Sequence, residues 1–175
     1  MAVASPSTSN DAFGLLGLTP RFDVEPQALE RAFFERSKEL HPDRFASAPA
    51  AERVVALTRS RALNDAYQTL KKPVARAEYL LARAGVTIGA NERLDPAFLM
   101  EILELREELA EARHAGRTGD VERMQADMLA RRTAVLEALP ALFAANDLSA
   151  IKTQLIVLRY LDRYLEECDA HLDED

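Results

Sequence analysis

Apolar residues recur with helical spacing along most of the chain, and prolines, glycines and capping residues mark the ends of the runs. Alanine, leucine, glutamate and arginine dominate while runs of β-branched residues are scarce, which favours helices over a sheet. The pattern therefore predicts an all-α protein. We expect helices over about 11–18, 26–40, 51–70, 73–84, 96–115, 119–143 and 147–172.

Prolines set both ends of the second predicted helix. Pro26 fits its first turn, and Pro42 ends it by disfavouring helical geometry at His41. Its apolar residues follow helical spacing: Leu29, Phe33, Phe34 and Leu40. Residues 43–50, DRFASAPA, are predicted to form a loop. The helix after this loop should place its apolar side chains on or near one side: Val54, Leu57, Ala62 and Leu63.

The three long segments of the second half are joined by short turns, which implies an antiparallel three-helix bundle. The middle helix has an apolar stripe for the core: Val121, Met124, Met128, Val135, Leu139 and Leu142. The last helix has another: Ile151, Leu155, Leu158, Leu161 and Leu165. Tyr160 falls largely on the opposite side of that helix, so it is expected to point away from the core.

The first helix of this bundle is apolar over more than half of its circumference in its first turns, wider than one buried stripe requires. The core-facing arc contains Phe98, Ile102, Leu105, Leu109 and Ala112. Beside this arc lie an apolar group, Leu99, Met100 and Leu103, and an acidic group, Glu104, Glu107 and Glu111. An apolar patch rimmed by carboxylates is typical of a protein-binding face. The alternative is that the apolar group packs against the first half of the chain or against another helix.

Charge divides the chain into two unlike halves. Residues 1–85 carry 12 basic and 10 acidic side chains, a net charge of +2, whereas residues 86–175 carry 10 and 19, a net charge of −9. Residues 85–95 contain two glycines and little periodicity, and we expect a hinge there. The asymmetry predicts two surfaces with different partners. Nucleic acid is a poor candidate for either, because binding phosphates needs a net basic field.

Several classes of protein are excluded by simple features of the sequence. Cys168 is the single cysteine, so the chain has no internal disulfide and no thiolate metal site of its own. Residues 1–10 resemble neither a secretory signal nor a mitochondrial presequence, and we expect a flexible tail there. No apolar run approaches the length of a membrane span.

The tripeptide His41-Pro42-Asp43 lies between the second and third predicted helices. In an enzyme, His41 and Asp43 would be an acid–base pair or two metal ligands, but no nucleophile motif or further ligand pair accompanies them. As a structural feature, the tripeptide would end one helix and turn the chain. As a docking site, Asp43 would accept a hydrogen bond from a partner arginine.

Basic residues on the preceding helix favour docking. Arg31 and Lys38 are nearly aligned on that helix, with Arg36 off to one side, and they would attract an acidic surface. Together with 64-NDAYQTLKKPVARAEYLL-81, this arrangement resembles the J-domain of DnaJ-type proteins over about residues 11–76. The resemblance implies that the tripeptide and the basic helix face bind a DnaK-type heat-shock chaperone and stimulate its ATPase.

Five segments extend the resemblance over nearly the whole chain after residue 10: LHPDRFAS, DAYQTL, RAEYLL, FLMEILELREEL and LRYLDR. They closely resemble the HscB family, the J-domain co-chaperones of iron–sulfur cluster assembly. The resemblance implies an L-shaped protein with a J-domain (11–76), a connecting helix and linker (77–95) and a bundle (96–175). The J-domain would bind the chaperone HscA and the bundle the scaffold IscU. The scaffold-binding positions carried over by motif are Leu99, Met100, Leu103, Glu104, Glu107 and Glu111, with Arg106 and Tyr160 added.

The expected protein is a non-enzymatic co-chaperone with no cofactor or metal. Eukaryotic members of the family carry an additional cysteine-rich metal module, which this sequence lacks, so we expect a bacterial cytoplasmic protein. One alternative is a J-domain co-chaperone of a DnaK-type chaperone with a different client. A second is an enzyme, which would turn over substrate without any added ATPase. A purely structural acidic bundle would leave the tripeptide unexplained.

Overall fold

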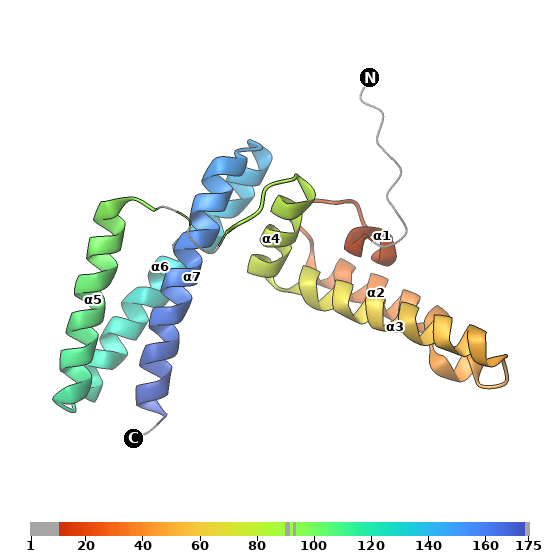
Figure 1. Cartoon of the computed structure of the whole chain (residues 1–175), viewed down its shortest axis with the longest axis horizontal. Helices are drawn as coiled ribbons and strands as arrows, with labels where there is room; N and C mark the ends of the chain where they lie inside the picture. Colours follow the sequence, from red (N-terminus) through yellow and green to blue (C-terminus); the bar gives the residue numbers. More distant parts are fainter. Residues whose placement is uncertain (1–10, 90–91, 93, 174–175) are drawn as a thin grey trace. The chain divides into compact units, whose positions relative to one another are not determined.

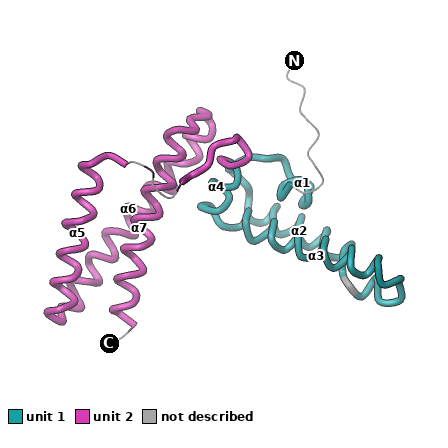
Figure 2. The backbone as a smooth tube through the Cα atoms, viewed as in Figure 1, with its two compact units in different colours: residues 1–80 teal, residues 81–175 magenta. Residues whose placement is uncertain are grey.

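The computed structural model describes residues 11–89, 92 and 94–173, in which there are seven α-helices, one 3₁₀ turn and no strand (Figure 1). The elements are α1 (Ala12–Leu16), α2 (Pro26–Leu40), η1 (Pro42–Phe45), α3 (Ala50–Lys71), α4 (Pro73–Arg83), α5 (Pro96–His114), α6 (Thr118–Ala144) and α7 (Leu148–Leu172). The predicted all-α fold is confirmed. The predicted tail, residues 1–10, and the side chain of Pro42 lie outside the described part. The chain divides into two compact units, residues 1–80 and residues 81–175 (Figure 2).

The first unit is built on the hairpin of α2 and α3, which lie side by side (Figure 1). The short helix α1 packs against both. Asp11 caps α1, because its Oδ2 accepts a hydrogen bond from the Gly14 amide at 3.3 Å. Gly17, at φ +68°, ends α1 in a left-handed conformation that suits glycine. The core between the three helices contains Phe13, Leu16, Leu29, Leu63 and Leu70.

Two side chains of α4 fasten it to the other helices of this unit. The Tyr79 hydroxyl accepts from the Ala12 amide at 2.9 Å and donates to Asp11, so that α4 holds the start of α1. Arg76 donates to the Leu70 carbonyl at 2.7 Å, which satisfies an unpaired carbonyl at the end of α3. Its guanidinium also lies 5.0 Å from the centre of the Phe22 ring.

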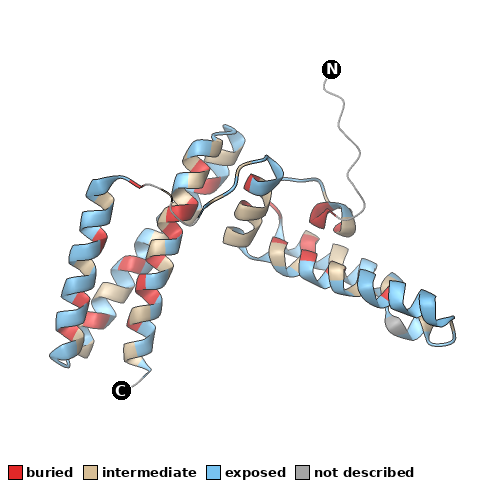
Figure 3. Cartoon of the chain, in the orientation of Figure 1, coloured by how far each residue is buried: buried red, intermediate tan, exposed pale blue. Residues whose placement is uncertain are grey.

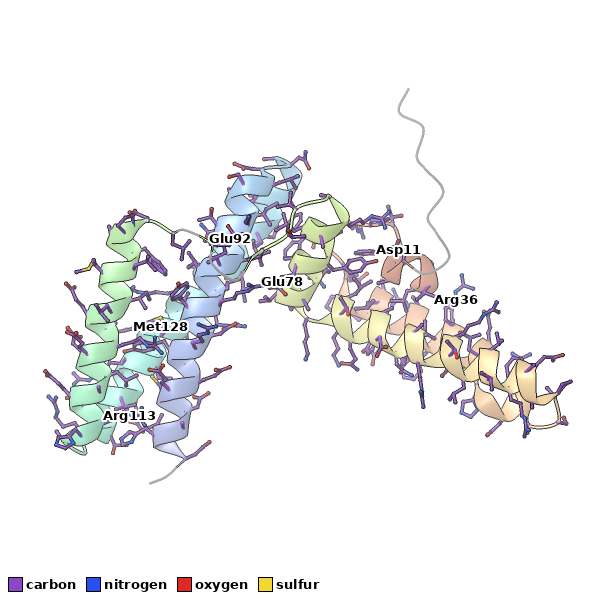
Figure 4. All side chains as sticks on the ribbon, viewed as in Figure 1. Asp11, Arg36, Glu78, Glu92, Arg113 and Met128 are labelled. Carbon is purple, nitrogen blue, oxygen red and sulfur yellow. The ribbon has the colours of Figure 1, made fainter. Side chains whose placement is uncertain are left out.

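The second unit is the predicted bundle of α5, α6 and α7 (Figure 1). The predicted core arcs of the three helices are confirmed, since their residues are buried or packed against the buried cluster, except Leu142, which is only half-buried. Met128 of the α6 arc is labelled in Figure 4. α7 also buries Ile156, Tyr164 and Cys168, which the single predicted stripe left out. Among the described residues, no helix combines the length and apolar character needed to cross a membrane.

Two local predictions for the first unit were wrong. Residues 43–50 are not all loop, because amides of Arg44 and Ala46 donate to the carbonyls three residues earlier and form η1. The apolar residues predicted on or near one side of α3 are divided, because Leu63 is buried while Val54 and Leu57 are 63% and 44% exposed. The buried side of α3 carries Ala56, Leu63, Ala66 and Leu70. Exposed residues dominate the tip of the hairpin (Figure 3), so the apolar residues of the first turns of α3 have little core to face.

Candidate protein-docking sites

The tripeptide forms the turn that follows α2. His41 is extended, at φ −60° and ψ 129°, and the Asp43 amide donates to its Nδ1 at 3.3 Å. The Asp43 carboxylate lies 3.5 Å from the same nitrogen but is 90% exposed. A carboxylate held on a short turn and open to solvent can accept hydrogen bonds from a partner cation. Its exposed position on the turn is that of a contact residue.

A hydrogen bond between side chain and backbone braces this turn against α2. The Arg44 Nη1 donates to the Lys38 carbonyl at 3.4 Å, one of the carbonyls that a helix end leaves unpaired. Below the turn lies a cavity of about 320 Å³, with an apolar wall that includes Leu40, Phe45 and Val55. Neither the hydrogen bond from Arg44 nor this cavity follows from the pattern of the sequence.

The three predicted basic residues of α2 do not form one surface. Arg31 and Lys38 are exposed, and Arg31 has only a long ion pair with Glu25, at 4.0 Å. Arg36 lies beside α1 (Figure 4), where a Cβ placed on Gly17 would come within 3.1 Å of its Nη2. It also pairs with Glu39 at 3.3 Å. Arg31 and Lys38 therefore share an outer face that Arg36 does not.

The apolar group on α5 is exposed. Leu99, Met100 and Leu103 are 37%, 57% and 52% exposed, so within the described structure they do not pack as core residues. We call these three residues the α5 patch. The acidic group that continues along the same side is exposed too: Glu104, Glu107 and Glu111. Within the bundle, the α5 patch is therefore an open apolar surface beside carboxylates.

The two residues added to this group, Arg106 and Tyr160, lie on the seam between α5 and α7. Arg106 binds Glu167 of α7, and this bond raises the pKa of its guanidinium. Tyr160 was predicted to point away from the core, which was wrong. It is half-buried, and its ring meets that of Phe98 edge-on, with centres 6.0 Å apart.

The segment before α5 is also attached to α7. Glu92 accepts from the Lys152 Nζ at 2.8 Å and from the Gly89 amide at 2.8 Å. These hydrogen bonds, that of Lys152 foremost, lower the pKa of the Glu92 carboxyl. The start of α5 and the α5 patch are thereby fixed to the bundle by an ion pair that precedes them.

The described residues contain no cluster of three or more side chains suited to a metal ion. Cys168 is fully buried, and burial raises the pKa of its thiol to about 11, so it is protonated and unreactive near neutral pH. The features that stand out are two exposed surfaces, one on α2 and η1 and one on α5. Both have the chemistry of protein docking.

Comparison with known proteins assigns a domain to each surface. Residues 11–79 match the DnaJ domain, and residues 94–169 match the HSCB C-terminal oligomerisation domain. A co-chaperone protein HscB homolog from Ralstonia nicotianae is 37% identical over 96% of this chain and 99% of its own length. One from Bordetella petrii is 48% identical over 60% of this chain, a match that spans 63% of that relative.

Two solved structures have the same fold. The chaperone HscB from Vibrio cholerae superposes with a TM-score of 0.80 and is 33% identical, over 94% of this chain and 98% of that one. Human co-chaperone protein HscB gives a TM-score of 0.83 at 27% identity, over 95% of this chain and 83% of that one.

Proposed function

Because this chain belongs to the HscB family of co-chaperones, we propose that it serves iron–sulfur cluster assembly in the bacterial cytoplasm. In this proposal the bundle binds an IscU-type scaffold, and the J-domain brings the scaffold to an HscA-type chaperone and stimulates its ATPase. The homologues are co-chaperones and not enzymes, and we assign no catalytic residue.

The chaperone side of the proposal is supported by the geometry of the tripeptide. Asp43 is 90% exposed on a turn that His41 and Arg44 hold in place, so little conformational entropy is lost when it binds. Arg31 and Lys38 lie on the outer face of the helix leading to it. Their charge would speed the encounter with an acidic chaperone surface.

The scaffold side is supported by the α5 patch, and this is the observation that carries the proposal. Three large apolar side chains on adjoining turns of α5 are 37–57% exposed. Burying the rest of their surface against a partner would release about half of the roughly 1.5–3 kcal/mol that full burial of such a side chain gives. The exposed carboxylates of Glu104, Glu107 and Glu111 would select a partner with a basic rim.

Two sites on one chain would couple the two events. A scaffold held by the bundle is tethered to a chaperone held by the J-domain, which raises the local concentration of one for the other. The boundaries we assign to these parts are 11–76 for the J-domain, 77–95 for the connection and 96–175 for the scaffold-binding bundle.

The test measures ATP turnover by an HscA-type chaperone and binding of an IscU-type scaffold with the same preparations. Asp43→Ala should abolish the stimulation of ATP turnover by the free co-chaperone while scaffold affinity stays unchanged. Leu99→Ala combined with Leu103→Ala should weaken scaffold binding by at least about tenfold, given two lost anchors, and leave stimulation by the free co-chaperone intact.

Leu129→Ala on α6 is the matched control for Leu103→Ala, since Leu129 is 47% exposed. It should leave scaffold affinity unchanged. Stimulation that survives Asp43→Ala would refute the role of the tripeptide. Stimulation without any scaffold binding by the unmodified protein would mean a J-domain co-chaperone with a different client.

A further inference from the structure

The outer face of α2 carries an exposed aromatic ring. Phe34 is 55% exposed, although phenylalanine is among the residues that proteins most often bury. Arg31 lies three residues before it and Lys38 four residues after it, the spacing of neighbours on one helix face. His41 follows three residues later still, so the same face leads to the tripeptide.

The core of the first unit is formed on another side of α2. Leu29 is buried there, and the Phe33 ring stacks on Tyr67 with centres 4.3 Å apart. Phe34 meets Phe33 at 6.1 Å in a tilted arrangement and otherwise faces outward. Full burial of a phenylalanine stabilises by roughly 1.5–3 kcal/mol, and the 55% exposure of Phe34 leaves about half of that unrealised. The fold therefore gains only part of this stabilisation from the ring, which suits a residue that is fully buried only when a partner binds.

On the proposed function, we infer that Phe34 is the apolar anchor of the chaperone interface. The surface that Phe34 would contact is an apolar depression with an acidic rim on the ATPase chaperone. The apolar ring would enter the depression, while the cations of Arg31 and Lys38, on either side of it along the helix, would meet the rim. Central aromatic side chains bordered by polar contacts are typical of interface hot spots.

Charge alone does not select the occupant of this face. The exposed Glu30 lies four residues before Phe34, so a second copy of the chain could pair opposite charges there. A basic client is less suited, because Arg31 and Lys38 would repel it and the acidic side of α5 would not. The face bearing Phe34 adjoins the tripeptide at the end of α2. A chaperone that contacts Asp43 therefore also lies beside Phe34, and we assign the chaperone to this face.

An anchor and a charge contribute differently to binding. Exposed charges mainly change the association rate, and salt screens them. A buried aromatic mainly slows dissociation and is little affected by moderate salt. Phe34 and the pair Arg31 and Lys38 can therefore be separated by the salt dependence of their effects.

The experiment titrates ATP turnover by an HscA-type chaperone with full-length protein, at about 0.05 M and about 0.3 M salt, where the screening length differs more than twofold. Phe34→Ala should raise the concentration for half-maximal stimulation about tenfold, or 1.4 kcal/mol, at both salts and leave maximal stimulation unchanged. Phe34→Leu, which keeps an apolar group, should raise the concentration for half-maximal stimulation by about threefold or less. Arg31→Gln with Lys38→Gln should weaken binding chiefly at the lower salt.

Val54→Ala is the matched control, because Val54 is 63% exposed on α3 of the same unit. The inference fails if Phe34→Ala changes half-saturation less than about twofold, or if Val54→Ala costs as much. It also fails if Phe34→Ala converts an oligomer into a monomer in light scattering, since the face would then bind a second copy. Unfolding midpoints and scaffold affinity should match those of the unmodified protein, which excludes misfolding.

Asp43→Ala, run in parallel, separates this inference from the proposed function. If Asp43→Ala abolishes stimulation and Phe34→Ala leaves it unweakened, only the role of Phe34 as an anchor is overturned. A protein that stimulates no HscA-type chaperone at any concentration would overturn both.

Discussion

Arg106 on α5 and Glu167 on α7 form an ion pair across the seam of the bundle, with the Arg106 Nε 3.3 Å from the Glu167 Oε2 and a second bond from Nη2 to Oε1. The positive charge of Arg106 is therefore already paired within the bundle. Glu104, Glu107 and Glu111 keep their negative field beside the α5 patch.

This ion pair should contribute little to stability, because both side chains are partly exposed. A double-mutant cycle of Arg106→Ala and Glu167→Ala, followed by urea unfolding, should give a coupling energy of about 0.2–1 kcal/mol. The coupling should shrink in high salt. A coupling above about 2 kcal/mol would mean that the pair behaves as a buried one.

The acidic group should govern the salt dependence of scaffold binding. Changing Glu104, Glu107 and Glu111 together to glutamine should weaken scaffold binding at low salt by severalfold. It should also flatten the dependence of the affinity on salt. Titration calorimetry at several salt concentrations measures both. Glu122→Gln, at an exposed position on α6, is the control and should change neither. An unchanged salt slope in the triple variant would assign the electrostatics to other residues.

Removal of the Tyr79 hydroxyl should destabilise the first unit. Tyr79→Phe deprives the buried Asp11 of a donor and the Ala12 amide of its acceptor, and an unsatisfied buried polar group costs about 1–3 kcal/mol. The loss should appear as a lower urea midpoint in circular dichroism. Tyr67→Phe is the matched control, since Tyr67 contributes a ring stacked on Phe33. Equal midpoints for the two variants would contradict the role of the hydroxyl.

The stability of the bundle should fall in alkali because of Cys168. Burial, followed by the negative charges of Asp169 and Glu167, raises the pKa of its thiol from 9.0 to about 11. Above pH 9 the unfolded chain loses this proton while the native bundle keeps it, so the free energy of unfolding decreases with pH. Between about pH 8 and about pH 10 the loss should be about 1 kcal/mol.

Cys168→Ala isolates this contribution, because any cavity that it leaves costs the same at both pH values. The difference between its urea midpoints at the two pH values should be smaller than that of the unmodified protein. An identical pH dependence would show that the thiol is not responsible. Tyr164, whose pKa burial raises to about 12, acts in the same direction only at higher pH.

The sequence predicts the ends of helices correctly where the backbone chemistry of proline determines them. Pro26 begins α2 and the chain leaves it at Leu40, because a proline has no amide to donate and restricts the residue before it. The core arc of α5 was also correct, since one apolar stripe with a single period is easy to read. Both predictions depend on local rules that need no knowledge of neighbouring helices.

The incorrect predictions concern side chains whose burial depends on packing between helices. α7 packs against both α5 and α6, so its buried arc is wider than a single stripe, and Tyr160 reaches Phe98 from outside the predicted stripe. On α3, the pattern groups Val54 and Leu57 with the buried Leu63, whereas the other buried positions include Ala56 and Ala66. Small residues allow close approach of helices, and their hydrophobic signal in a sequence is weak.

α6 and α7 share a much more extensive interface than α5 shares with either of them. Besides its buried arc of Ile102, Leu109 and Ala112, α5 is held along its edges by ion pairs to Arg131 and Glu167 and by the ring contact between Phe98 and Tyr160. Local opening is easiest where few apolar contacts must break. The amides of α5 should therefore exchange with deuterated water before those of α6 and α7. The helix that presents the α5 patch is therefore the one whose local opening a bound protein would suppress most.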